Sequence, residues 1–211
     1  MKKNFFLLAA IVGLFGCKKN NSGPAKDYTA LLKNSIWTGE FNYTGKPSQP
    51  VSISFQDGGQ VTWYELVGSS SGTWKVDNGL LSVSLSTGAG FKTTIADDNT
   101  FSGIQNLPVN GFALTNAALN TLPDQLIDNT SWAGTNVALH FKAGNKLDME
   151  LGPAGSTKYT NLSYVREAKT IRFSALPAYK WFIVSSSIPA MKGANQFSPD
   201  PTTYTFQVTK Q

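Results

Sequence analysis

The chain carries one pattern twice, and this duplication constrains its fold more than any single motif. Residues 34–39 (NSIWTG) recur as residues 129–134 (NTSWAG), 95 positions later. Residues 51–55 recur as 137–141, only 86 positions later, and a longer loop at 44–50 in the first copy accounts for the change. Further matches 90 positions apart pair Trp74 with Tyr164, Leu81 with Ile171, Val83 with Phe173, Phe91 with Trp181 and Gly103 with Gly193. Anchors repeated in one order predict a repeated structural unit.

Within each copy, apolar and polar residues alternate with a period of two, as in a half-buried strand. Val51, Ile53 and Phe55 would lie on one face, with Ser52 and Ser54 on the other. Clusters of Gly, Asn and Asp separate these segments and suit tight hairpin turns, so neighbouring strands should be antiparallel. We predict strands at 36–43, 51–56, 60–67, 72–76, 80–86, 90–96, 101–105, 111–115, 131–135, 137–142, 146–151, 158–165, 169–175, 179–186, 190–194 and 203–209.

Only two short segments, 27–33 and 116–126, are predicted to be helical, and Pro123 breaks the second. The predicted fold class is therefore all-β, with two tandem antiparallel meanders that each form a small up-and-down barrel. The alternative is one larger barrel or sandwich assembled from two half-barrels. Each copy is close to the size at which a lone core becomes marginal, so the halves should share an interface or a common sheet.

The order of the anchor residues also resembles a known group of barrels. The motifs are Asn34-x-x-Trp37-x-Gly39, Phe55-x-x-Gly58, Gly72-x-Trp74 and Phe101-x-Gly103. Together they resemble the lipocalin-like and avidin-like barrels called calycins. In both families a tryptophan on the first strand plugs the closed end of the barrel, and small molecules bind in the mouth. The resemblance implies that Trp37 and Trp132 are matched structural plugs.

The N-terminal residues predict secretion and lipid attachment. Lys2 and Lys3 precede an apolar run at 5–15, which is typical of a secretory signal peptide. Residues 14–17 (LFGC) resemble the bacterial lipobox, which implies cleavage before Cys17 and acylation of that residue. The start of the mature chain also resembles Bacteroidetes-type envelope lipoproteins. The predicted organisation is a signal peptide at 1–16, a lipidated cysteine and flexible tether at 17–26, a first β repeat at 27–122 and a second at 123–211.

The predicted location is the cell envelope, with the protein attached to the membrane through acylated Cys17. No later segment approaches the roughly 20 apolar residues of a spanning helix. The residue after Cys17 is Lys18, whereas an aspartate at this position would resemble an inner-membrane retention signal, so the outer membrane, facing the periplasm, is favoured. An acidic run resembling a surface-export tag is missing from the sequence, so surface exposure stays an open question.

Composition and motifs argue against several activities. Removing Lys2 and Lys3 lowers the formal charge from +5 to a small, dispersed surplus, so no nucleic-acid partner is expected. The sequence has one histidine, and its one cysteine is expected to be acylated, so it has none of the usual spacings of zinc-binding residues. Neither a metal nor a cofactor is expected. Residues 68–72 (GSSSG) match a nucleophile elbow but are expected to form a loop, because no helix follows. Glu65 and Glu150 are interpreted as edge-guarding charges at matched strand ends. We therefore predict no catalytic residues and no enzyme activity.

The aromatic residues carry the case for binding. In the neighbouring pairs Trp63–Tyr64 and Trp181–Phe182, the two rings must point to opposite faces of the sheet, so one ring of each pair lies outside the main core. His140 lies on the face opposite Leu139 and Phe141 and would be outward-facing or pocket-lining. The candidate ligand-binding residues are Trp63, Tyr64, His140, Trp181 and Phe182.

Two functional hypotheses follow. In the first, the protein is a non-enzymatic binding module that takes a small apolar ligand or a glycan in a barrel mouth. In the alternative, it is a structural or accessory protein that docks another envelope protein through its duplicated surfaces. The interiors of the two halves distinguish these hypotheses, because a filled interior favours docking.

Overall fold

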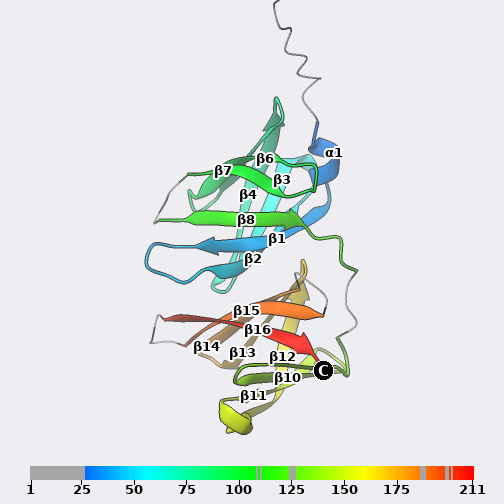
Figure 1. Cartoon of the computed structure of the whole chain (residues 1–211), viewed down its shortest axis with the longest axis vertical. Helices are drawn as coiled ribbons and strands as arrows, with labels where there is room; N and C mark the ends of the chain where they lie inside the picture. The colour runs from blue at the N-terminus through cyan, green and yellow to red at the C-terminus, as the bar shows by residue number, and fades with distance from the viewer. Residues whose placement is uncertain are drawn as a thin grey trace, which may run out of the picture.

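The computed structural model describes residues 27–107, 109, 111–123, 127–185, 189–197, 200 and 202–211. They form two eight-stranded antiparallel sheets stacked along the long axis of the molecule (Figure 1). Each sheet encloses its own apolar core. The prediction of two tandem barrels is confirmed, and the alternative of one composite barrel is wrong. The predicted signal peptide and the tether with Cys17 lie outside the described residues.

The first barrel begins after the short helix α1 (Thr29–Leu32), which falls within the helix predicted at 27–33. Its elements are β1 (Ser35–Asn42), β2 (Gln49–Phe55), the 3-10 turn η1 (Asp57–Gly59), β3 (Gln60–Glu65), β4 (Gly68–Asp77), β5 (Leu80–Leu85), β6 (Gly90–Ile95), β7 (Phe101–Leu107) and β8 (Ala113–Leu119).

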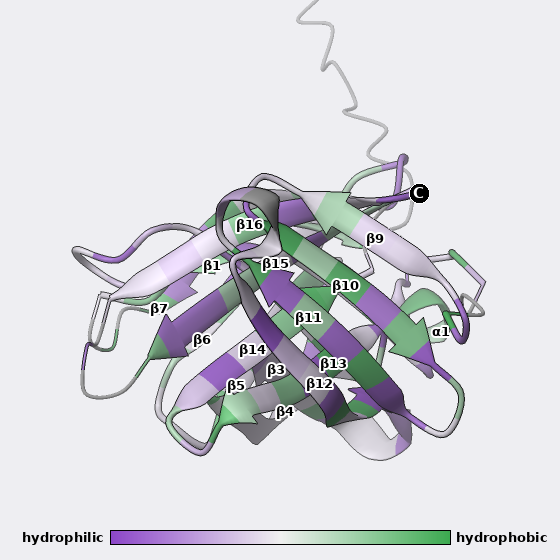
Figure 2. Cartoon of the chain, turned by 90° about the horizontal axis from the view of Figure 1, so that it is seen from below, coloured by the Kyte–Doolittle hydropathy of each residue, from purple (hydrophilic) through white to green (hydrophobic). Residues whose placement is uncertain are grey.

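The second barrel repeats this order of strands. Its elements are β9 (Ser131–Gly134), β10 (Val137–Lys142), β11 (Lys146–Leu151), the 3-10 turn η2 (Pro153–Gly155), β12 (Thr157–Glu167), β13 (Thr170–Leu176), β14 (Tyr179–Val184), β15 (Ala190–Phe197) and β16 (Thr203–Lys210). Figure 2 shows hydrophobic and hydrophilic bands alternating along β10, β11 and their neighbours, as expected for strands with one buried face.

The two sheets close in different ways. In the second barrel, β9 pairs with both β10 and β16, so the ladder is continuous around the barrel. In the first barrel, the described residues close the sheet with one isolated bridge, between Thr100, just before β7, and Ala118 of β8. The side chain of Asn106 extends this contact, since its Nδ2 donates to the Leu114 carbonyl at 3.2 Å and its Oδ1 accepts from the Leu114 amide at 2.8 Å. An amide side chain thus replaces a missing pair of ladder bonds.

The strand registers reproduce the duplication seen in the sequence. Val83 pairs with Phe91 in the first barrel, and Phe173 pairs with Trp181 in the second. Trp37 and Trp132 are equally well matched, because Trp37 Nε1 donates to Ser35 Oγ and Trp132 Nε1 donates to Thr130 Oγ1, each at 2.9 Å. Both indoles are almost fully buried. The two copies therefore share side-chain bonds as well as strand order.

The helix predicted at 116–126 is wrong as far as the structure describes that segment, because residues up to Leu119 belong to β8. A bulge opposite Glu40 and Phe41 leaves both Thr115 and Asn116 exposed. The buried positions Leu114 and Ala117 are consequently three residues apart, which imitates helical spacing. Pairing with β1 outweighs the weak local preference.

Residues 68–72 also differ from the prediction, since they begin β4 and do not form a loop. Tyr64 pairs with Ser69 and Thr62 with Ser71 in a regular hairpin with β3. A strand, not a helix, follows the GSSSG segment, so the strand-to-helix turn of a nucleophile elbow is not formed there.

The barrels are joined by a small apolar cluster and by hydrogen bonds between their backbones and side chains. Five buried residues, with Ala168 against them, form this interface cluster: Tyr64, Leu66, Phe182, Val184 and Ala194. Ser52 Oγ donates to the Ala168 carbonyl at 2.5 Å, and Asn120 Nδ2 donates to the Ser185 carbonyl at 2.7 Å. The outer face of β2 is mostly buried by this contact, as its inner face is by the barrel core.

The interface joins non-equivalent faces of the two copies. Strand register places Glu150 at the position that corresponds to Tyr64, and Lys92 at the position that corresponds to Phe182. The apolar rings at the interface are therefore not part of the shared barrel pattern. They are the substitutions that make one copy fit the other.

We expect Phe182→Ala to weaken the interface so that the two barrels unfold in separate steps. Truncating a fully buried phenylalanine lowers the free energy of unfolding by about 3–5 kcal/mol. Calorimetry should show a lower first unfolding transition, resolved from a second. The matched control is Lys92→Ala at the corresponding exposed position, which should change stability by less than about 0.5 kcal/mol. Equal effects of the two substitutions would contradict this role for Phe182.

Candidate functional site

The interior of the first barrel is filled with aromatic rings at its mouth. Phe41 lies edge-on to Trp63 with ring centroids 5.1 Å apart, and Trp63 contacts Phe112 at 5.3 Å. All three residues are almost fully buried. These rings occupy the space in which a ligand would enter a barrel of this kind.

The second barrel lacks the residues that fill the first. Register places Met149, a smaller side chain, at the position that corresponds to Trp63. Strand β9 ends at Gly134, so the position that corresponds to Phe41 is Asn136, a turn residue with φ 61°. The longer β1 thus carries the ring that closes the first mouth, and the shorter β9 leaves the second mouth without it.

The open mouth forms a pocket of about 410 Å³, which we call the mouth pocket. This volume is within the range of small-molecule sites. Its aromatic residues are Tyr179, Trp181, Tyr204 and Phe206, and its polar residues include Thr135, Asn136, Asn195 and Thr205. The described residues that line it carry no charge. Leu176, Phe197 and Tyr204, all near this end of the barrel, are exposed hydrophobic side chains.

Trp181 is the central ring of the mouth pocket. It stacks on Phe173 with an interplanar angle of 8°, and its centroid lies 5.1 Å from Phe206 and 5.2 Å from Tyr179. Its Nε1 is buried and has no hydrogen-bond partner among the described residues. A buried donor without an acceptor is unfavourable by about 1–3 kcal/mol. The ring is thus held among its aromatic neighbours, while its buried N–H has no acceptor among the described residues.

Burial raises the pKa of Tyr179, and the neighbouring hydroxyls of Tyr159 and Tyr204 raise it further. The phenol therefore stays neutral over a wide pH range. A neutral hydroxyl both donates and accepts hydrogen bonds. With Asn136 and Asn195, it gives the mouth pocket polar groups but no net charge.

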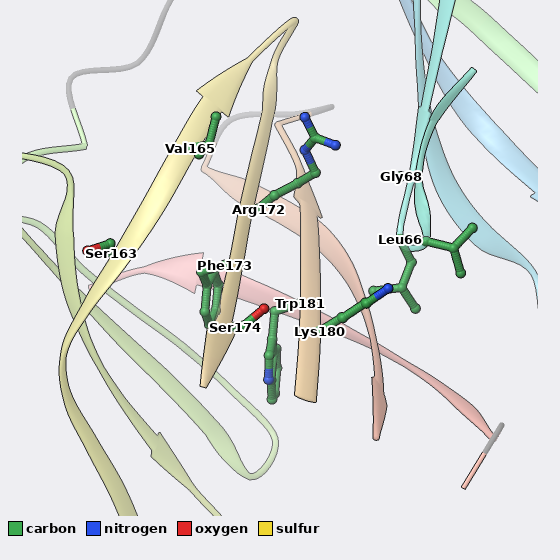
Figure 3. Close-up of a pocket in the computed structure, with 10 residues that line it drawn as sticks. Leu66, Gly68, Ser163, Val165, Arg172, Phe173, Ser174, Lys180 and Trp181 are labelled. Carbon is green, nitrogen blue, oxygen red and sulfur yellow. The ribbon is translucent and has the colours of Figure 1, made fainter. Parts of the chain in front are cut away.

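A second hollow lies where the two barrels meet, and we call it the junction groove (Figure 3). Its volume is about 500 Å³. One wall is the hairpin turn at Leu66, Val67 and Gly68, and the other is the outer surface of β12, β13 and β14. Trp181 and Phe173 lie side by side at its base, so Trp181 borders both hollows.

The structure places the five predicted ligand-binding residues in four different environments. Trp63 lies in the first core, and Tyr64 and Phe182 lie together in the interface cluster. Trp181 lies in the second core and borders both hollows. The expectation that neighbouring rings point to opposite faces is confirmed for both pairs.

The fifth residue, His140, lies on the outer face of β10. Its Nδ1 is 3.0 Å from Ser131 Oγ, and its cross-strand partner is Asp148. The Asp148 carboxylate is bonded by Lys142 at 2.5 Å and by the Asn161 amide at 2.7 Å, which hold the pKa of Asp148 below its usual range. Because a catalytic triad needs the carboxylate on the imidazole Nδ1, these three residues are not arranged as one.

Sequence reasoning missed most of the mouth pocket. Tyr179, Tyr204, Phe206 and the two asparagines have no property that distinguishes them from ordinary strand and turn residues. The lack of a ring at the position that corresponds to Phe41 was an indication in the sequence, since the offset of 95 residues sets Asn136 against Phe41. No cluster of metal-ligating side chains occurs among the residues that the structure describes, nor does any helix long and apolar enough to span a membrane.

Comparison with protein-family models, with curated proteins and with solved structures finds no match to this chain.

A buried carboxyl group near the first mouth corrects the interpretation of Glu65 and Glu150 as matched edge charges. Glu65 is 6% exposed and accepts a hydrogen bond from the Tyr43 hydroxyl at 3.3 Å. Burial raises the pKa of Glu65 to about 7, despite that hydrogen bond. Glu150 instead lies on the outside of the second barrel in a 2.7 Å ion pair with Lys158.

We expect Glu65 to make the folded state less stable as pH rises. The folded protein favours the protonated carboxyl, so its stabilising effect is complete below the unfolded pKa and is lost as pH rises through about 7. Glu65→Gln imitates the protonated form and should be more stable than the wild type at pH 8, by on the order of 2–3 kcal/mol. At pH 4 the two proteins should be similar. Urea unfolding at both pH values measures this, and a stability difference that does not change with pH would contradict the assignment.

Proposed function

We propose that this protein is an envelope-tethered, non-enzymatic binding protein whose second barrel takes a neutral glycan in its mouth pocket. The observation that carries the proposal is the uncharged set of aromatic rings, amides and hydroxyls around Trp181. Aromatic faces pack well against the C–H faces of a sugar ring, and amide and hydroxyl groups bond its hydroxyls. The resemblance of the anchor motifs to calycins, which bind ligands in the mouth, supports the same location.

Tyr204 provides the most direct test of this site, because it lines the pocket and is 54% exposed. The full chain with Cys17→Ser, which cannot be acylated, would be titrated with a panel of neutral oligosaccharides, lipids, a sterol and haem while its tryptophan fluorescence is followed. We expect saturable binding of an oligosaccharide, and Tyr204→Ala should weaken it about three- to tenfold, as expected for loss of one ring contact.

The control for this titration is Val165→Ala, which alters an exposed residue outside the mouth pocket and should leave the affinity unchanged. Preference for the apolar ligands would contradict the assignment to glycans. The absence of saturable binding by any member of the panel would contradict a ligand site in the barrel mouth.

The tether is tested separately. We expect the wild-type chain, expressed in a bacterium with lipoprotein-processing enzymes, to incorporate labelled palmitate and to fractionate with membranes. Cys17→Ser should abolish the label and release the protein from the membrane fraction, since one residue carries all of the acyl chains. Membrane association that survives this substitution would show that the anchor is elsewhere.

The filled first barrel favours a second candidate, in which the protein docks another envelope protein. The first barrel would then act as a rigid support, because the buried rings of Phe41, Trp63 and Phe112 pack against one another at its mouth. Crosslinking in whole cells followed by purification in detergent tests this candidate. A purely monomeric species would count against it.

A further inference from the structure

We propose that the junction groove is a separate binding site for a fatty carboxylate, an anionic head group on an apolar chain. The proposal does not rest on the mouth pocket, because the two hollows differ in chemistry. The mouth pocket is lined by uncharged residues, whereas two basic side chains, Arg172 and Lys180, line the groove.

The lips of the groove are apolar and come from both barrels. Val67, on the β3–β4 turn, is 59% exposed, and Val165, on β12, is 58% exposed. Both line the groove, together with Leu66. Two valines this exposed, on opposite walls of one hollow, would be covered by an apolar chain lying between them, and burying them is favourable.

The base of the groove is apolar because β12 and β13 separate. Their pairing stops at Tyr164 and Phe173, and a bulge between Ser174 and Leu176 redirects β13. Beyond this point the edges of Phe173 and Trp181, which belong to the second core, border the groove. An apolar chain can therefore contact core rings without entering the barrel.

The charge of the groove is carried by Lys180. Arg172 is already paired with Glu167 at 2.8 Å and lies over the Tyr64 ring, 5.8 Å from its centroid. Lys180 has no hydrogen bond or ion pair with any residue that the structure describes, and Figure 3 shows its side chain extending toward the hairpin that carries Leu66. The ammonium group of Lys180, beside the apolar walls of the junction groove, can bind one carboxylate whose apolar chain lies along the groove.

Sodium decanoate, below its micellar concentration, is a suitable probe. Calorimetric titration of the full chain with Cys17→Ser should show saturable binding, and Lys180→Met should weaken it about tenfold, because a charge-assisted hydrogen bond is lost. Methionine keeps the apolar stem, and Lys180 is exposed, so the fold should not change. Val165→Glu, which places a negative charge on the lip, should weaken binding in the same way.

Two matched controls locate the site. Lys75→Met removes an exposed lysine of the first barrel outside the groove, and Tyr204→Ala alters the mouth pocket. Both should bind decanoate as the parent chain does. If Tyr204→Ala loses decanoate while Lys180→Met retains it, the ligand is in the mouth and the proposal is wrong, whatever the outcome of the oligosaccharide titration.

The chemical class is tested with two further probes. Decanol, which has the same chain and no charge, should bind at least tenfold more weakly than decanoate, as expected without the charge-assisted bond. Equal binding of decanol and decanoate, or no saturable binding of decanoate, would overturn the proposal. Binding to phosphatidylglycerol vesicles without binding of free decanoate would also overturn it, because the groove would then contact a membrane surface.

Discussion

The way the two barrels sit together depends on a few side chains that point out of each barrel. These side chains are buried between the barrels, where they would otherwise face water. Tyr64 and Leu66 on one copy meet Phe182, Val184 and Ala194 on the other. The turn at Ala168 and Lys169, where both residues have positive φ, reaches the first barrel, where Ser52 donates to the Ala168 carbonyl. Lys169 also donates to the Leu122 carbonyl in the segment that joins the barrels. Left-handed conformations at such residues are unfavourable on their own. Docking therefore stabilises both the turn and the groove beside it.

Differences between the copies matter more for function than their shared pattern does. A closed antiparallel ladder needs only alternation and short turns, and both copies supply these. Whether the closed ladder has space for a ligand depends on a few interior volumes. A longer β1 brings Phe41 over one mouth, and the shorter β9 leaves Asn136 at the other. Duplication has thus produced one solid barrel and one with an accessible aromatic mouth.

The strand order, the antiparallel pairing and the matched burial of Trp37 and Trp132 could be predicted, because they depend on local alternation and on repeated anchors. Strand β8 could not, since a bulge sets Leu114 and Ala117 three residues apart, as in a helix. The burial of Glu65 and the groove at Lys180 could not either. Both depend on which residues from distant strands, or from the other barrel, come to lie beside them. Of the residues that line the mouth pocket, only Trp181 was predicted. An aromatic residue in excess of what the core needs indicates a binding role, but it does not indicate which other residues lie beside it.

Joining unlike faces has a consequence for how many such units can associate. A head-to-tail contact between similar modules leaves one unused copy of each face, and such contacts can continue without limit into fibres. Here the unused counterparts are Glu150, paired with Lys158, on the second barrel and the exposed Lys92 on the first. A further module docking in the same way would have to desolvate both charges, which is costly. The charged residues at these two counterpart positions therefore disfavour the addition of further modules in the same head-to-tail arrangement.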